Sequence, residues 1–129
     1  MAEPLIFVNT YAIKEGKLDA YKAEVPPWLE FLEANHPRML HFGAYINEAS
    51  TEVTVVQVHP DAESMDFQLK LIAGEVQKWA EYIEWSGMSI LVCGSPGEAT
   101  REGMRQVAGS GVPVSVKTPL AGFSRLPQT

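Results

Sequence analysis

The sequence predicts a single α+β domain whose elements follow in the order βαββαβ, with a C-terminal extension. Three observations support this prediction. The 129 residues suit one domain. Stretches rich in β-branched residues alternate with two stretches of helical periodicity, and Gly and Pro residues separate them. This order is typical of the ferredoxin-like split βαβ fold, an antiparallel four-stranded sheet with two helices on one face.

The N-terminal third predicts a strand followed by a helix. Residues 5–13 are rich in β-branched and aromatic side chains and end at a Glu-Gly turn signal. In residues 18–35, apolar side chains recur at spacings of three, four and seven, which places them on one stripe of a helix. Pro26 and Pro27 interrupt the stripe. Because a proline removes a backbone hydrogen bond, we expect a kink or a restart at Val25.

The rest of the domain predicts a hairpin, a second helix and a fourth strand. Residues 39–47 and 52–59 have strand patterns, and the four residues between the hairpin partners suit a turn. The second helix has the most regular apolar spacing, and Asp61 can cap its start. We expect this helix to end near Trp85, before a fourth strand over residues 88–93.

The extension at residues 95–129 lies outside the ferredoxin-like domain, which we assign to residues 1–94. Its pattern predicts a short helix over residues 98–108 and a strand over residues 112–117. Because its apolar residues need a surface to cover, we expect the extension to pack on the domain or on a partner subunit. Its strand would then add to a sheet edge or cross to the partner. A disordered tail is the alternative.

Composition excludes several classes of partner. The net charge of -6 has the wrong sign for a protein that grips nucleic acid or an anionic membrane. No stretch approaches the roughly 18 apolar residues of a membrane span. The single Cys93 cannot form an internal disulfide, and the N-terminus lacks the pattern of a signal peptide. We therefore expect a cytoplasmic protein that binds neither nucleic acid nor membranes.

Both faces of the predicted sheet are apolar. In the third strand, for example, Val53 and Val55 oppose Val56 and Val58. Two helices can cover only one face, so we expect a homodimer in which a second copy closes the other face, sheet against sheet. The alternative is that the extension folds back over its own sheet.

Motifs of metal, phosphate and serine chemistry are absent from the sequence. The three histidines are scattered, and no CxxC or HExxH pattern occurs, so no metal site is predicted. What remains is a set of polar residues within apolar strands, and all of them have odd numbers. These residues are Asn9, Tyr11, His41, Tyr45, Gln57 and His59.

Convergence of these residues would give a mostly apolar cavity with a few polar groups, which is typical of a small-molecule site. For each candidate a structural role is the alternative. Asn9 would be a strand asparagine bonded to a nearby loop, and His41 a histidine with one satisfied nitrogen. Trp79 lies on the buried helical stripe and would belong to the core. His59 directly precedes a proline at a strand end, where we expect it to be exposed.

Residues 4–94 resemble the antibiotic biosynthesis monooxygenase (ABM) family of the dimeric α/β-barrel superfamily. The resemblance rests on LIFVN at residues 5–9, HFGAY at 41–45, VTVVQVH at 53–59 and DAESM at 61–65. It implies that two protomers pair through their sheets as a dimeric α/β barrel. It also implies that an asparagine of the first strand and a tryptophan of the second helix, here Asn9 and Trp79, line a substrate cavity.

The haem-degrading branch of that family adds a histidine on the second helix. This chain has none between residues 62 and 85, so haem would need His41 or His59 from the sheet, and we expect no cofactor. The resemblance then implies a homodimer that binds a small aromatic or polyketide-like molecule and oxygenates it without a cofactor. A non-catalytic ligand-binding or stress-responsive dimer is the alternative.

Direct reaction with dioxygen requires an electron-rich carbanion or phenolate, so the protein must remove a proton and hold the anion in a dry pocket. His41 is the candidate base, and Asn9 is the second candidate catalytic residue. Tyr45 and the Trp79 indole are candidate donors to substrate oxygens. The candidate substrate-binding residues are Tyr11, Tyr45, Trp79 and His59.

Overall fold

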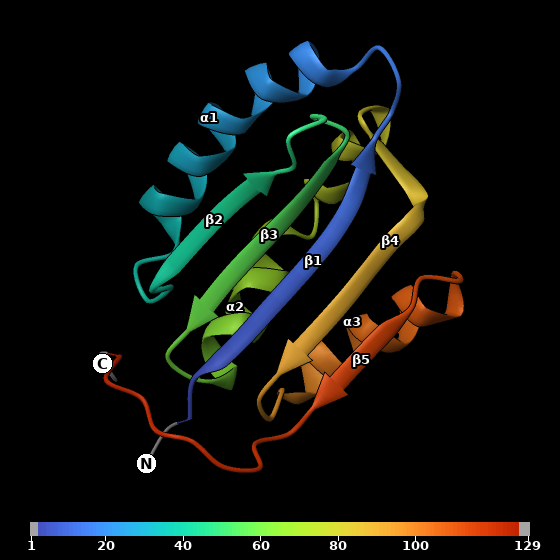
Figure 1. The fold of residues 1–129 in the computed structure, drawn as a ribbon. Helices are drawn as coiled ribbons and strands as arrows, with labels where there is room; N and C mark the ends of the chain where they lie inside the picture. The colour runs from blue at the N-terminus through green and yellow to red at the C-terminus, as the bar shows by residue number, and fades with distance from the viewer. Residues whose placement is uncertain (1–2, 127–129) are drawn as a thin grey trace.

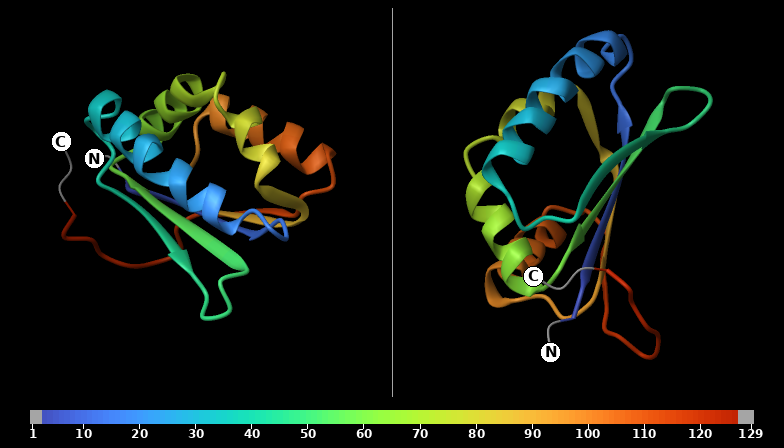
Figure 2. Two further views of the ribbon diagram at one scale, coloured as in Figure 1. Left: turned by 90° about the horizontal axis from the view of Figure 1, so that it is seen from above. Right: turned by 90° about the vertical axis from the view of Figure 1, so that its left-hand side faces the viewer.

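The computed structural model describes residues 3–126 as one sheet with all of its helices on one face (Figures 1 and 2). The sheet has five strands in the order β2-β3-β1-β4-β5. Neighbouring strands are antiparallel except β5, which runs parallel to β4. The elements are β1 (Leu5–Ile13), α1 (Leu18–Asn35), β2 (His41–Ile46), β3 (Glu52–His59), α2 (Ala62–Ile72), the short 3-10 helix η1 (Val76–Glu81), β4 (Ile83–Cys93), α3 (Glu98–Gly109) and β5 (Val114–Lys117).

This is an α+β ferredoxin-like fold with a mixed sheet. The predicted sheet had four antiparallel strands, and the observed sheet has a fifth strand that is parallel to its neighbour. The fifth strand comes from the C-terminal extension, where we predicted a strand over residues 112–117. None of the described helices is long and apolar enough to cross a membrane.

Helix α1 runs through Pro26 and Pro27 without the predicted restart. Both prolines are exposed, as are Lys22 and Ala23 one turn earlier, whose carbonyl groups lose their helical partners. Water can donate hydrogen bonds to those carbonyls on the outer side of the helix. The prolines therefore cost less here than they would on the buried side.

The stretch that was predicted as one second helix forms α2, η1 and the first residues of β4. Helix α2 ends at Ile72, η1 follows, and Ile83 already belongs to β4. Gly74 lies in the interruption, where a glycine weakens a helix. From Ile83 the chain pairs with Ile13 of β1, past an irregularity in register between Thr10 and Ala12. Strand pairing with β1 thus overrides the helical spacing of the apolar residues.

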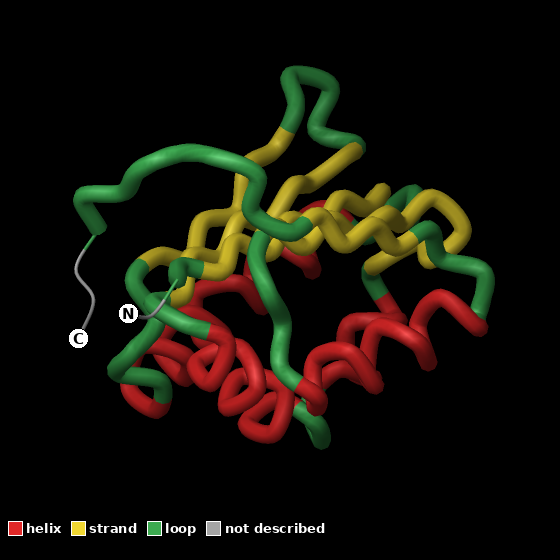
Figure 3. The backbone as a smooth tube through the Cα atoms, turned by 90° about the horizontal axis from the view of Figure 1, so that it is seen from below, coloured by secondary structure: helices red, strands yellow, loops and turns green. Residues whose placement is uncertain are grey.

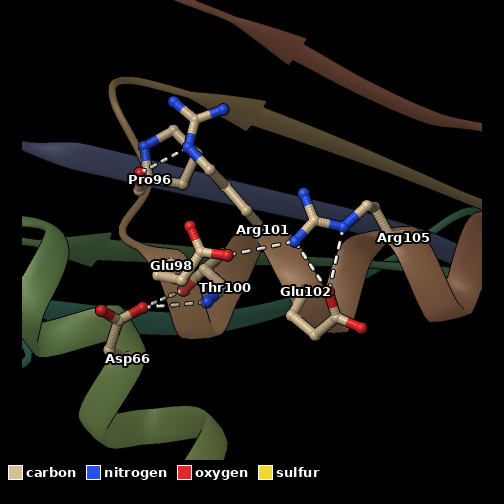
Figure 4. Close-up of polar contacts among 7 residues, drawn as sticks. All are labelled: Asp66, Pro96, Glu98, Thr100, Arg101, Glu102 and Arg105. Atoms are coloured by element: carbon tan, nitrogen blue, oxygen red, sulfur yellow. Dashed lines mark hydrogen bonds and ion pairs between the residues drawn. The ribbon is translucent and has the colours of Figure 1, made fainter.

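The first turn of α3 is fixed by a carboxylate from α2 (Figure 4). Gly97 occupies the N-cap position and has no side chain to cap the helix. Instead, Asp66 accepts hydrogen bonds from the backbone N–H of Thr100 at 3.0 Å and from its hydroxyl at 2.7 Å. A Cβ atom at residue 97 would collide with the Asp66 carboxylate, so glycine allows this approach. Asp66 thereby joins the extension to the domain.

The strand register divides the side chains of the sheet between a helix-covered face and an open face. On the covered face, one row across the sheet is Ala44, Val55, Asn9 and Ile90, and the next is Phe42, Gln57, Phe7 and Val92. On the open face, the matching rows are Gly43, Val56, Val8 and Leu91, and then His41, Val58, Ile6 and Cys93. Figure 3 shows the helices on one side of the sheet only.

A cavity between the sheet and the helices as candidate functional site

A cavity of about 220 Å³ lies on the covered face. Strands β1 to β4 form its floor, and α1, α2, η1 and α3 all contribute to its walls. Its lining is mainly apolar, and all three tryptophans of the chain belong to it. Val76 and Trp85 in this lining are 41% and 38% exposed, so the cavity reaches solvent where η1 meets β4.

Two amide side chains of the lining have a buried oxygen without a hydrogen-bond partner. They are Asn9 on β1 and Gln68 on α2, through their Oδ1 and Oε1 atoms. Buried polar atoms in folded proteins nearly always have partners, and leaving one unpaired costs about 1–3 kcal/mol. Both oxygens are enclosed by protein atoms, and a rotation of either side chain would let its amide form a hydrogen bond with a molecule in the cavity.

Aromatic residues form one wall of the cavity. The hydroxyl groups of Tyr11 and Tyr21 share a hydrogen bond of 2.6 Å, and burial raises the pKa of both phenols. Both therefore stay protonated at neutral pH. Trp79 packs edge-on against Tyr21 and Trp28, with ring centroids 5.7 Å apart in each pair. Trp79 is thus a part of the core and of the cavity wall at once.

His59 is completely buried, which corrects the expectation that it is exposed. Pro60 turns the chain directly into α2, whose first turn brings Ser64 over the end of β3. The His59 Nδ1 atom lies 2.7 Å from the Ser64 hydroxyl oxygen, and its Nε2 atom lies 3.1 Å from the Gln57 Oε1 atom. His59 does not line the cavity but contacts Gln57, which does. Burial, followed by the neighbouring His36, lowers the pKa of His59 to about 4.

The structure brings only part of the predicted set together. Asn9, Tyr11 and Trp79 line the cavity, as does Gln57. His41 and Tyr45 lie on the open face, opposite Val58 and Thr54. Odd residues of β2 pair with even residues of β3, so equal parity places them on opposite faces.

His41 and Tyr45 contact each other on that open face. The His41 Nε2 atom lies 3.0 Å from the Tyr45 hydroxyl oxygen, and the two rings are stacked with centroids 6.5 Å apart. The tyrosine ring folds back across Gly43, where any Cβ atom would collide with it. The sheet therefore separates the candidate base His41 from the cavity of its own chain.

Gln68 and Tyr21 are cavity residues that the sequence analysis did not single out. Gln68 had a usable signal, since it lies between Met65 and Ile72 on the buried stripe of α2, where a polar residue is unusual. Tyr21 had none, because an aromatic residue on an apolar stripe is ordinary core.

The lining favours binding over proton transfer. Among the described residues that form it, the two tyrosines are the only titratable side chains, and their pKa values are raised. No histidine is among the described residues of this lining. Within residues 3–126 no group of three or more His, Cys, Asp or Glu side chains could hold a metal ion. Apolar packing and amide hydrogen bonds are what this cavity offers.

Comparisons with known proteins give structural neighbours only. No family model matches the chain, and no curated protein matches its sequence. MupZ from Pseudomonas fluorescens is 21% identical with a TM-score of 0.73, over 97% of this chain and 91% of its own. A match of that extent includes most of the C-terminal extension.

Two further neighbours cover less of the chain. A putative antibiotic biosynthesis monooxygenase from Bacteriodes thetaiotaomicron is 12% identical with a TM-score of 0.59, over 68% of this chain and 85% of its own. SnoaB from Streptomyces nogalater, a cofactor-independent oxygenase studied as a mutant, has the same identity and TM-score, over 70% of this chain and 91% of its own. At these identities the likeness shows the fold, which is ABM-like as the sequence resemblance implied.

Proposed function

We propose that this protein binds a small, largely apolar molecule with hydroxyl groups, aromatic or polyketide-like, in the cavity of the covered face. The observation that carries the proposal is the pair of buried, unpartnered oxygens of Asn9 and Gln68 within an aromatic lining. A ligand hydroxyl that donates to either oxygen would remove the cost of leaving it unpaired. The rings of the lining supply the apolar contact.

Equilibrium dialysis with 2-naphthol and 2-methylnaphthalene tests this proposal. The two molecules have nearly the same shape, but only the naphthol can donate a hydrogen bond. We expect Asn9→Leu and Gln68→Met each to lower the affinity for 2-naphthol, relative to that for 2-methylnaphthalene, by roughly 3- to 10-fold. The comparison between proteins cancels the difference in hydration of the two ligands. Failure of the wild-type protein to bind either molecule would contradict the proposal.

We propose oxygenation without a cofactor as the reaction to test, because the ABM-like neighbours include a cofactor-independent oxygenase. The substrate must then be a carbon acid, such as an anthrone, that ionises readily. Dioxygen adds to its carbanion, one oxygen atom becomes the new carbonyl oxygen, and the other leaves as water. Because the lining tyrosines stay protonated, the acidity of the substrate itself must supply the anion.

An oxygen electrode with 1,8-dihydroxyanthrone separates this reaction from binding alone. Acceleration above spontaneous oxidation, with one dioxygen consumed per anthrone and one labelled oxygen atom retained in the product, would support catalysis. Binding without acceleration would support the second candidate function, a non-catalytic ligand-binding dimer. The absence of a neutral-pH base from the described lining favours that alternative.

We also propose that a second copy of the chain covers the open face. The central rows of that face are apolar, including Ile6, Val8, Val56, Val58 and Leu91, and no helix of the described chain lies over them. The sheet-to-sheet homodimer that the sequence predicts would bury these side chains, as apolar surface in water favours.

A further inference from the structure

The polar groups of the cavity are neighbours on the sheet. Gln57 lies opposite Phe7 and Asn9 lies opposite Val55, so the two amides are diagonal neighbours on adjacent strands of the covered face. Gln68 contributes its unpaired oxygen from α2, and is only 1% exposed. Asn9 and Gln68 thus leave acceptors unused in the same cavity that Gln57 lines.

The orientation of the Gln57 amide is not free. An amide can present either its oxygen or its NH2 group after a half-turn, and the neighbours decide which. Here the Gln57 Oε1 atom lies 3.1 Å from the Nε2 atom of His59. Because a carbonyl oxygen only accepts, His59 must carry a hydrogen on Nε2 and donate it.

The hydrogen bonds of a second histidine, His36, give the same direction of donation at the other end of this hydrogen-bond network. The His36 Nε2 atom lies 3.0 Å from the backbone carbonyl oxygen of Ser64, so it must carry a hydrogen too. That nitrogen is also 3.5 Å from the Ser64 hydroxyl oxygen, to which it can only donate. The hydroxyl hydrogen of Ser64 is then left for the bare Nδ1 atom of His59, 2.7 Å away. Donors therefore point in one direction, from His36 through Ser64 and His59 to Gln57.

We propose that His59 is a positioning residue, which holds the oxygen of Gln57 so that the NH2 group of this amide donates into the cavity. The cavity then has a donor at Gln57 beside acceptors at Asn9 and Gln68. The ligand class that matches is a hydroxylated aromatic ketone, with its carbonyl oxygen at Gln57 and a hydroxyl at one of the acceptors. This inference rests on the proposed function, because it specifies the ligand of the same cavity.

The direct test uses 2-acetonaphthone and 2-ethylnaphthalene, which differ by a carbonyl oxygen. Gln57→Met is expected to lower the ratio of their affinities by roughly 3- to 10-fold, because the variant keeps the apolar volume and loses the donor. The ratio of 2-naphthol to 2-methylnaphthalene should stay within twofold, since it depends on Asn9 and Gln68. An unchanged acetonaphthone ratio in Gln57→Met would overturn the inference.

Two variants of His59 separate positioning from a merely structural role. His59→Gln can place an NH2 group near the former Nε2 atom, whereas His59→Asn keeps a polar atom only near the former Nδ1 atom. Both remove the buried ring, but we expect His59→Gln to keep the acetonaphthone ratio within twofold and His59→Asn to lower it. Equal ratios in the two variants would contradict the positioning role.

The wild-type protein gives a measurement that does not depend on whether these variants fold. Long-range 15N–1H NMR correlations report which nitrogen of a histidine carries the hydrogen. We expect His59 to carry it on Nε2 at pH 7, and a hydrogen on Nδ1 would overturn the inference. Failure of all four naphthalenes to bind would instead refute the proposed function, which keeps the two failures distinct.

Discussion

The two faces of the sheet have similar apolar side chains but differ in how their polar groups are satisfied. On the open face, the hydroxyls of Thr10 and Thr54 bond each other at 2.9 Å, and the rings of His41 and Tyr45 form their own pair at the surface. On the covered face, Asn9 and Gln68 retain buried oxygens without partners. An exposed polar group finds water, whereas a buried one needs a partner. This contrast supports the proposals that the covered face binds a ligand and that the open face associates with a second copy.

The largest expected effect comes from placing a charge on the open face. Val8 lies between Val56 and Leu91 in its central row, so Val8→Asp would bury two carboxylates, one from each copy, in a sheet-to-sheet dimer. We expect the dissociation constant of the dimer to rise by roughly 100-fold or more in this variant. Sedimentation velocity at micromolar concentration should show wild type at twice the 14.2 kDa chain mass and the variant at the chain mass.

Ala23→Asp is the matched control, because Ala23 is exposed on α1 and away from the sheet. It adds the same charge and should leave the dimer intact. A monomeric wild-type protein, or a Val8→Asp variant that still dimerises as tightly, would contradict the assignment of association to the open face.

The next effect concerns the covered face and pH. The folded state holds His59 neutral with a pKa of about 4, whereas the unfolded chain protonates it at its ordinary pKa. As pH falls from about 6.5 to 4, the unfolded state gains the proton first, so stability is lost across this window. The expected loss is on the order of 3 kcal/mol in the free energy of unfolding. The lowered pKa of His36 acts in the same direction.

Urea unfolding at pH 7.0, 5.5 and 4.5 measures this dependence. His59→Gln should flatten it, because glutamine does not titrate in this range. His41→Gln makes the same substitution at an exposed position and is the matched control. Equal slopes in both variants would show that the pH dependence has another origin.

The amino-acid sequence predicts which residues form the strands, but not which face of the sheet each side chain joins. Apolar residues that recur at a spacing of two, or at helical spacings, indicate which side chains are buried. From this pattern β1 and β3 were predicted with the bounds that the structure shows. The register between strands has no such local signal. It decides that Gln57 faces the cavity and that His41 does not, although both have odd numbers.

Tertiary contacts explain the other differences. The break after Ile72 arises because β4 begins at Ile83 to pair with β1, although the apolar spacing continues as if in one helix. The burial of His59 depends on Ser64 arriving from α2. The pairing of Ile83 with Ile13 is remote in sequence, and Ser64, although only five residues from His59, reaches it only because the chain turns into α2. The candidate site could therefore be predicted by its residue types but not by its geometry.

A smaller effect is expected if the unpartnered amide of Gln68 lowers the stability of the ligand-free protein. Gln68→Met keeps the shape of the side chain and removes an amide whose oxygen is buried without a partner. We expect the ligand-free variant to be more stable than wild type by about 1 kcal/mol in urea unfolding. Gln77→Met, at an exposed position of η1, should change stability by less than about 0.5 kcal/mol. A destabilised Gln68→Met variant would mean that the amide already has a partner.

The smallest expected effect is that of His41→Ala. The sequence made His41 the candidate base, a role in which its removal lowers turnover more than affinity. The side chain lies across the sheet from the cavity, and its pair with Tyr45 is exposed. We therefore expect affinity for 2-naphthol within twofold of wild type and a stability change below about 0.5 kcal/mol. Loss of turnover on an oxygenated substrate, with affinity unchanged, would contradict the division between the faces, because the open face would then take part in the reaction.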